Sequence, residues 1–180
     1  MTPANIAGDC AGRMILALLL VAGTGCATTE PESPVPCFRV GKAKKSCMTE
    51  KGPTAGQQSD ARRFEASPQL LTIYVVRDRW ADATHMVPIE VDGRPAQTLP
   101  QSFVRARVAA GRHLLRLSFG GTSHSIEVEG RAGEVVVVDL AGSVWSWSTS
   151  FRWEAAASAG VRERLQRARL TGDIAVEAGT

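Results

Sequence analysis

The sequence predicts an all-β fold, an antiparallel β-sandwich with a C-terminal helix, which follows an N-terminal signal peptide and a flexible linker. Short apolar runs rich in β-branched residues, separated by turn residues, fill the chain from Leu70 onward. The stretch before this domain is poor in apolar residues and rich in proline, glycine and polar residues. An unbroken apolar run stands near the N-terminus. We therefore expect a signal peptide over residues 1–25, a tether over 26–67 and a folded domain over 68–180.

The N-terminal apolar run extends from Met14 to Ala22 and follows Arg13. It is shorter than the roughly 20 residues that a membrane-spanning helix needs, which favours the apolar segment of a signal peptide. Small residues, Gly23 to Gly25, separate it from Cys26. This arrangement resembles the processing site of bacterial lipoproteins, in which the cysteine receives the lipid. Gly23 departs from that pattern, which usually has leucine there; the alternative is ordinary secretion with a plain thiol at Cys26.

The residue after Cys26 is Ala27 rather than aspartate. The resemblance to lipoproteins then implies a lipid-anchored protein of the bacterial cell envelope, at the outer membrane and facing the periplasm. In this reading, the membrane is a partner through the N-terminal lipid.

Two cysteines stand in the predicted tether. Cys37 and Cys47 flank FRVGKAKKS, and in an exported chain they enter an oxidising compartment, which favours a local disulfide. Closing so small a loop contributes up to about 3 kcal/mol in the chain-entropy model. A metal pair or a redox dithiol is the alternative, but the spacing matches neither a C-x2-C zinc site nor a C-x-x-C redox motif.

Seven runs in the domain have the alternating or β-branched pattern of strands. Turn residues separate them at intervals of about 8 to 12 residues, as expected for antiparallel strands that follow one another. Asp92-Gly93 is the strongest hairpin signal. The run Val135–Val138 lacks polar alternation, so we expect a central strand covered on both faces. The expected strands are 70–77, 86–91, 94–99, 102–108, 112–119, 122–130 and 134–140.

The next segment is aromatic, and the chain then changes to a helical pattern. In SVWSWSTSFRW the large side chains occupy alternate positions, so they share one face of a strand. That face either closes the core of the sandwich, which we favour, or forms a platform for a ligand. Its residues are Trp145, Trp147, Phe151 and Trp153. From Glu154 we expect an amphipathic helix whose arginines point largely outward.

The order of these motifs is similar to that of a bacterial lipoprotein family known as domain of unknown function 2846. The resemblance covers residues 70–173 and is carried by IYVVR, VDG, AAGRHLL and AGEVVVVDL. Ala110 departs from the family pattern, which usually has proline before Gly111, and a valine replaces a common aromatic in the last motif. The resemblance implies the β-domain fold and no catalytic residues.

No pattern for catalysis or metal binding is evident. The three histidines, His85, His113 and His124, match no zinc spacing, so we expect no metal and no cofactor. There is no G-x-S-x-G nucleophile motif and no glycine loop before a helix that would hold phosphates. The formal charge of +3 is modest, and the sequence has no basic stripe with interleaved aromatics. We therefore expect no binding of nucleic acid.

These observations favour a membrane-anchored envelope lipoprotein that is not an enzyme and acts as an interaction or accessory module for an envelope protein or glycan. The alternative hypothesis is a binding protein for an envelope glycan or peptide, which would use the aromatic face. An enzyme whose residues converge only in three dimensions is the third and least favoured hypothesis.

Overall fold

The computed structural model describes residues 34–40, 44–78, 84–145, 148–156 and 160–175. Every described helix and strand belongs to one compact unit, Glu32–Thr180. The apolar run and Cys26 lie outside the described residues. Among the residues that are described, no helix is both long and apolar enough to span a bilayer.

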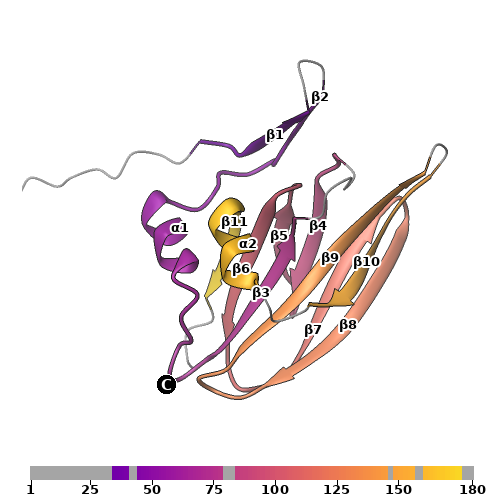
Figure 1. Ribbon diagram of the computed structural model, residues 1–180. Helices are drawn as coiled ribbons and strands as arrows, with labels where there is room; N and C mark the ends of the chain where they lie inside the picture. The colour runs from indigo at the N-terminus through magenta and orange to yellow at the C-terminus, as the bar shows by residue number, and fades with distance from the viewer. Residues whose placement is uncertain (1–33, 41–43, 79–83, 146–147, 157–159, 176–180) are drawn as a thin grey trace, which may run out of the picture. The chain divides into compact units, whose positions relative to one another are not determined.

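A five-stranded sheet forms the middle layer of the unit (Figure 1). Its strand order is β10-β9-β3-β6-β11. The β3–β6 and β9–β10 pairs are antiparallel, whereas β3–β9 and β6–β11 are parallel. The strands are β3 Leu71–Arg77, β6 Ser102–Val108, β9 Val135–Trp145, β10 Ser148–Ala155 and β11 Arg169–Ala175.

A four-stranded antiparallel sheet packs on one face of the first sheet, in the order β5-β4-β7-β8. Asp92 and Gly93 join β4 to β5 with φ values of 51° and 76°, as expected for the predicted tight hairpin turn. The predicted all-β sandwich is therefore confirmed. The strands are β4 Val87–Val91, β5 Arg94–Thr98, β7 Gly111–Phe119 and β8 Thr122–Gly130.

The two sheets enclose the main core. Ile73, Val75 and Val104 from the five-stranded sheet pack with Ile89 and Leu115 from the four-stranded sheet. Alternate residues of the same strands point the other way and form a second apolar cluster, because successive side chains of a strand lie on opposite faces. The described residues of both clusters lie within Glu32–Thr180, so residues 32–180 carry the two cores without the segment that precedes them.

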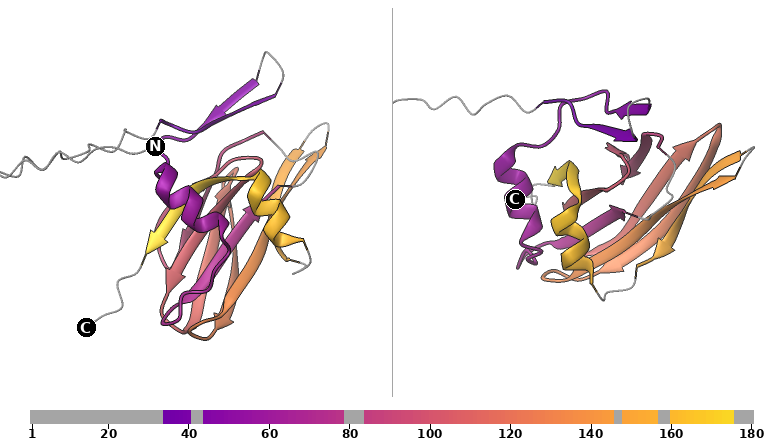
Figure 2. Two further views of the ribbon diagram at one scale, coloured as in Figure 1. Left: turned by 60° about the vertical axis from the view of Figure 1, so that its left-hand side comes forward. Right: turned by 45° about the horizontal axis from the view of Figure 1, so that its top comes forward.

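Two helices cover the second cluster on the face of the five-stranded sheet that is turned away from the other sheet (Figure 2). They are α1 Ala55–Arg62 and α2 Val161–Arg167. Ala61 from α1 and Leu165 from α2 are both fully buried there. The strand covered over its whole length on both faces is consequently β3, and not the predicted Val135–Val138, of which only Val138 is buried.

The predicted tether differs most from the structure. Residues 34–67 hold a hairpin of β1 Cys37–Val40 and β2 Lys44–Cys47, joined by the Cys37–Cys47 disulfide, and then α1. The hydroxyl of Tyr74 donates to the carbonyl of Ala61 at 2.9 Å, which ties α1 to the sheet. The segment is poor in apolar residues, yet it packs on the domain, so the compact unit begins at Glu32 and not near Ser67.

The C-terminal region also differs from the prediction. The helix occupies only Val161–Arg167, because β10 extends to Ala155 and the chain continues as β11 after Ala168. Leu170 and Thr171 are buried at the edge of the sheet, where β11 pairs in parallel with β6. This long-range pairing overrides the local helical pattern of the sequence.

Candidate anion-binding cleft

The first helix begins at a complete capping box. The amide of Gln57 donates to the hydroxyl of Thr54 at 3.2 Å, and the amide of Thr54 donates to the side chain of Gln57 at 2.8 Å. Such a cap satisfies two amides that would otherwise have no partner within the helix. The cap therefore sets where α1 starts beside the preceding proline-rich segment.

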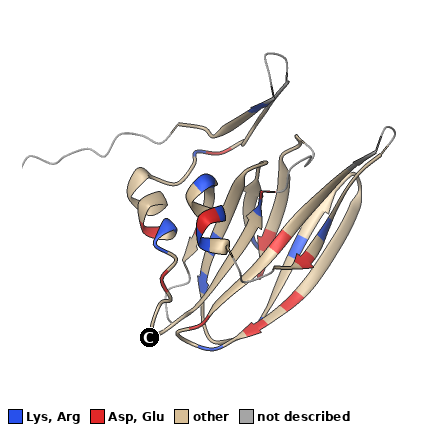
Figure 3. Ribbon diagram, viewed as in Figure 1, with Lys and Arg blue, Asp and Glu red and all other residues tan. Residues whose placement is uncertain are grey.

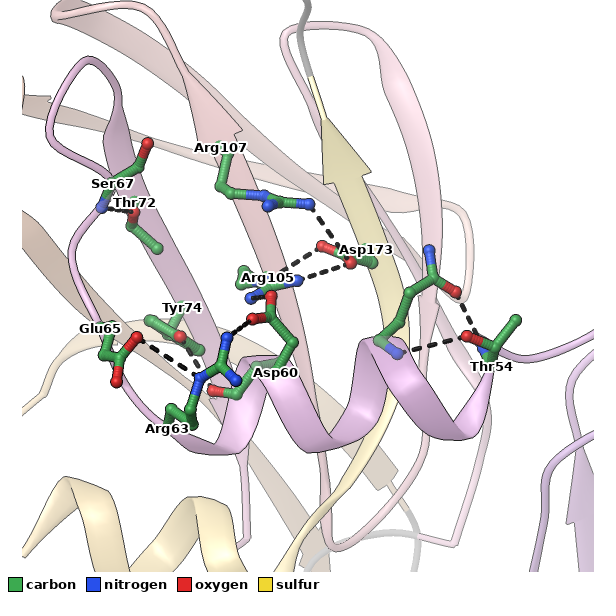
Figure 4. A network of polar contacts seen from close by, with 12 residues as sticks. Thr54, Asp60, Arg63, Glu65, Ser67, Thr72, Tyr74, Arg105, Arg107 and Asp173 are labelled. Carbon is green, nitrogen blue, oxygen red and sulfur yellow. Dashed lines mark hydrogen bonds and ion pairs between the residues drawn. The ribbon is translucent and has the colours of Figure 1, made fainter. Parts of the chain in front are cut away.

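A buried arginine ties α1 and β11 to β6 (Figure 4). Arg105 is only 4% exposed. Its Nε and Nη2 donate to Asp173 on β11 at 2.9 and 2.7 Å, and its Nη1 donates to Asp60 on α1 at 2.6 Å. The hydrogen bond from Arg105 holds the pKa of Asp60 below its ordinary value. This charge is neutralised inside the domain, so Arg105 has a structural role.

A second arginine fixes α2. Arg164 donates from Nε and Nη2 to Asp78 at 2.9 and 2.6 Å, and from Nη2 to Asp139 at 2.8 Å. The hydrogen bonds to Asp78 are the main cause that raises the pKa of Arg164 above its ordinary value. Arg164 was expected to point outward from an amphipathic helix. Its charge instead anchors the helix on Asp78, directly after β3, and on Asp139 within β9.

An open cleft lies between the segment before α1, the two helices and the start of β11. It has a volume of about 720 Å³, and its charged lining residues are Arg62, Arg63 and Arg169. A smaller cleft of about 220 Å³ shares Arg62 and Arg169 and adds Arg167. No aspartate or glutamate belongs to the described lining of either cleft. We call the two together the arginine cleft.

Three of the four arginines in the cleft have no carboxylate partner among the described residues. Arg167 and Arg169 are exposed and form no ion pair there. Arg62 donates from Nη2 to the carbonyl of Ala168 at 2.8 Å, while its Nε is buried without a hydrogen-bond partner. Arg63 differs, because it pairs with Asp60 and with Glu65. The cleft therefore has a local excess of positive charge.

Guanidinium groups present planar sets of N–H donors that match the oxygens of phosphate and carboxylate groups. A cleft with three uncompensated arginines is suited to bind an anionic group. In Figure 3 the basic positions on α1 and α2 lie on the helical layer of the domain. The described lining of the cleft offers guanidinium donors together with the hydroxyls of Thr54 and Ser59, and such an arrangement suits the binding of an anion.

The predicted aromatic face is only partly described. Phe151 is 3% exposed and belongs to the main core. Trp153 packs against that core, and its Nε1 donates to the backbone carbonyl of His124 at 3.1 Å. Trp147 and the side chain of Trp145 lie outside the described residues.

The three histidines are separate. His113 faces the carboxylate of Asp92 at 2.6 Å through Nδ1 and the carbonyl of Ala109 at 2.8 Å through Nε2. His85 and His124 are exposed. In the part of the chain that the structure describes, no three His, Cys, Asp or Glu side chains come together as metal ligands would. The contacts of His113 support the β4–β5 and β6–β7 turns.

Sequence reasoning missed most of the arginine cleft. The outward arginines of the predicted helix indicated a basic surface, but Arg62 stands in a segment that reads as a linker. Arg62 and Ala168 are far apart in the chain, with a separation of 106 residues, and only the fold brings them into contact. The adjacent pair Arg62-Arg63 at the end of a capped helix was the one local signal available.

Comparison with models of protein families finds no match to this chain, and comparison with curated proteins finds none either. The resemblance to domain of unknown function 2846 therefore stays a prediction. The candidate function depends on the geometry of the arginine cleft.

Proposed function

We propose that this chain is a membrane-anchored, non-enzymatic module of the bacterial envelope, and that its arginine cleft binds an anionic group of an envelope partner. The observation that carries the binding role is the lining of the cleft, in which Arg62, Arg167 and Arg169 have no described carboxylate partner. Lipid at Cys26 would hold the module at the outer membrane, on its periplasmic side.

The anchoring role is supported by the sequence. An apolar run of signal-peptide length ends in small residues before Cys26. Cys37 and Cys47 are joined in a disulfide, which leaves Cys26 as the free cysteine that would remain after removal of residues 1–25. A disulfide also suits an oxidising compartment such as the periplasm.

Anchoring is tested by membrane fractionation. Cys26→Ser should release the protein from the membrane fraction, whereas Ala27→Ser, which retains the thiol, should leave it there. Unchanged fractionation of Cys26→Ser would contradict lipidation.

Anion binding is tested separately on residues 32–180 by calorimetric titration with inorganic pyrophosphate. The wild-type unit should bind with an affinity that falls as salt is added, because exposed charges are screened. The double variant Arg167→Gln/Arg169→Gln should bind pyrophosphate much more weakly. Binding by this variant as tight as that of the wild-type unit would contradict the assignment of the cleft as the anion site.

The alternative, a glycan- or peptide-binding protein that uses the aromatic face, has less support. Phe151 is enclosed in the core, and Trp153 is half-buried against that core with its indole N–H donated to the backbone carbonyl of His124. This alternative would depend on Trp145 and Trp147.

A further inference from the structure

We infer that the anionic partner of the arginine cleft is the phosphate-bearing surface of the bilayer that holds the chain, so that the domain lies against the membrane with its helical layer facing the lipid. This inference rests on the proposed function, because it assumes the anchor at Cys26 and anion binding in the cleft. It adds the chemical class of the partner and the orientation of the domain.

The distance from the anchor to the cleft supports a membrane partner. Pro34 and Pro36 line the cleft, and the carbonyl of Pro36 accepts from the amide of Met48 at 3.0 Å at the base of the β1–β2 hairpin. The next amide, that of Thr49, donates to the side chain of Gln97 on β5 at 2.8 Å. The entering chain is thereby held against the domain. Pro34 follows Cys26 by eight residues, which span at most about 28 Å when fully extended. The rim of the cleft consequently stays near the headgroups of an anchored molecule.

The composition of the rim is that of a surface that meets lipid. Val35 stands between the two prolines and is 45% exposed. Among the described residues, Val35 and Leu114 on β7 are the two large apolar side chains that are exposed. An exposed apolar residue beside uncompensated arginines suits the boundary between headgroups and acyl chains. A small soluble anion would need the arginines but not Val35.

The charge balance of the helical layer also favours an anionic surface. Arg162, Arg167 and Arg169 are exposed and unpaired within the described chain, and Arg62 adds a fourth charge. The acidic groups nearby are Glu163 on α2, which is exposed, Asp60 and Glu65, which pair with Arg63, and Asp78 and Asp139, which pair with Arg164. Each basic residue near an anionic membrane strengthens binding by about five-fold.

The layer order sets the orientation. Both helices cover the outer face of the five-stranded sheet, so the four-stranded sheet is on the opposite side (Figure 2). A domain that lies on lipid through its helices presents the outer face of β7 and β8 to the periplasm. That face carries the exposed pairs Arg112–Glu129 and, between β7 and β4, Arg116–Glu90.

The test uses residues 32–180 without the lipid, so that any binding comes from the domain itself. Co-sedimentation with phosphatidylcholine vesicles, with and without phosphatidylglycerol, measures the partition coefficient. The test variant is Arg167→Gln/Arg169→Gln. The control is Arg112→Gln/Arg116→Gln, which removes the same number of charges from the opposite face. Circular dichroism checks that each variant is folded.

The expected result is binding that requires phosphatidylglycerol and falls by about 25-fold in the cleft variant, from two factors of about five. The control variant should lose less than about two-fold. Val35→Ser should also weaken binding to vesicles while leaving pyrophosphate binding unchanged.

Equal loss in the two arginine variants, or equal binding to neutral vesicles, would overturn the inference. Binding of pyrophosphate without binding of vesicles would overturn it as well, while leaving the proposed anion-binding function in place. Failure to bind either probe would overturn both.

Discussion

The Arg105 network allows a quantitative test of how α1 and β11 are held, because its two carboxylates differ in burial. The side chain of Asp173 is 2% exposed, whereas that of Asp60 is 36% exposed. Breaking a buried pair by removing one partner costs about 3–5 kcal/mol, since the other charge stays buried and uncompensated. Pairs that are open to solvent contribute about 0–1 kcal/mol.

We therefore expect Asp173→Asn to lower the free energy of unfolding by about 3 kcal/mol, the low end of the range for buried pairs. The low end applies because Asp60 still faces Arg105 at 2.6 Å and the asparagine oxygen can accept one hydrogen bond. Asp60→Asn should cost about 1 kcal/mol or less. Both are measured by urea denaturation of residues 32–180.

A double replacement separates the charge from the packing. Arg105→Met/Asp173→Leu should restore most of the stability lost in Asp173→Asn, because apolar residues of similar volume need no compensation for buried charge. Equal losses for Asp173→Asn and Asp60→Asn, or a loss below about 1 kcal/mol for Asp173→Asn, would refute the argument from burial.

Two further predictions concern the packing of α1. Burial raises the pKa of Tyr74 above its ordinary value, so the stability linked to its neutral hydroxyl is present below about pH 10 and is lost as the pH rises through the folded-state pKa. Because Tyr74 is the single tyrosine, an absorbance titration of the folded chain reports it alone, and ionisation at the ordinary value would contradict its burial. Thr54→Ala should lower the free energy of unfolding by about 1 kcal/mol through loss of the helix cap, with Thr54→Ser, which retains the hydroxyl, as the control; equal costs for the two variants would argue against the cap.

The strands of the sandwich could be predicted from local patterns. Residues 71–77 and 102–108 have the β-branched or alternating composition of strands, and Asp92-Gly93 supports the left-handed φ values of a tight turn between β4 and β5. Such signals depend only on neighbouring residues, so they are visible in the sequence. The disulfide between Cys37 and Cys47 was predictable for the same reason, because the two cysteines stand close together in the chain.

The tertiary structure alone decided which faces are covered and where the charges meet. α1 has a polar composition, and it is retained on the sheet by Arg105 and Tyr74 from strands that follow it. β11 forms because Leu170 is buried beside β6, against the helical pattern of its own segment. Both outcomes depend on contacts between residues far apart in sequence, which no local pattern records.

The candidate site shows the same division. The sequence by itself determined the class of fold, the signal-like apolar run and the cysteine at its end. Only the fold placed Arg62 beside Arg169 in a cleft without acidic side chains, and only the fold withdrew Arg164 from the surface to pair with Asp78. The physical reason is that the neighbours of a charged side chain in space decide whether its charge is compensated. The tertiary structure sets those neighbours.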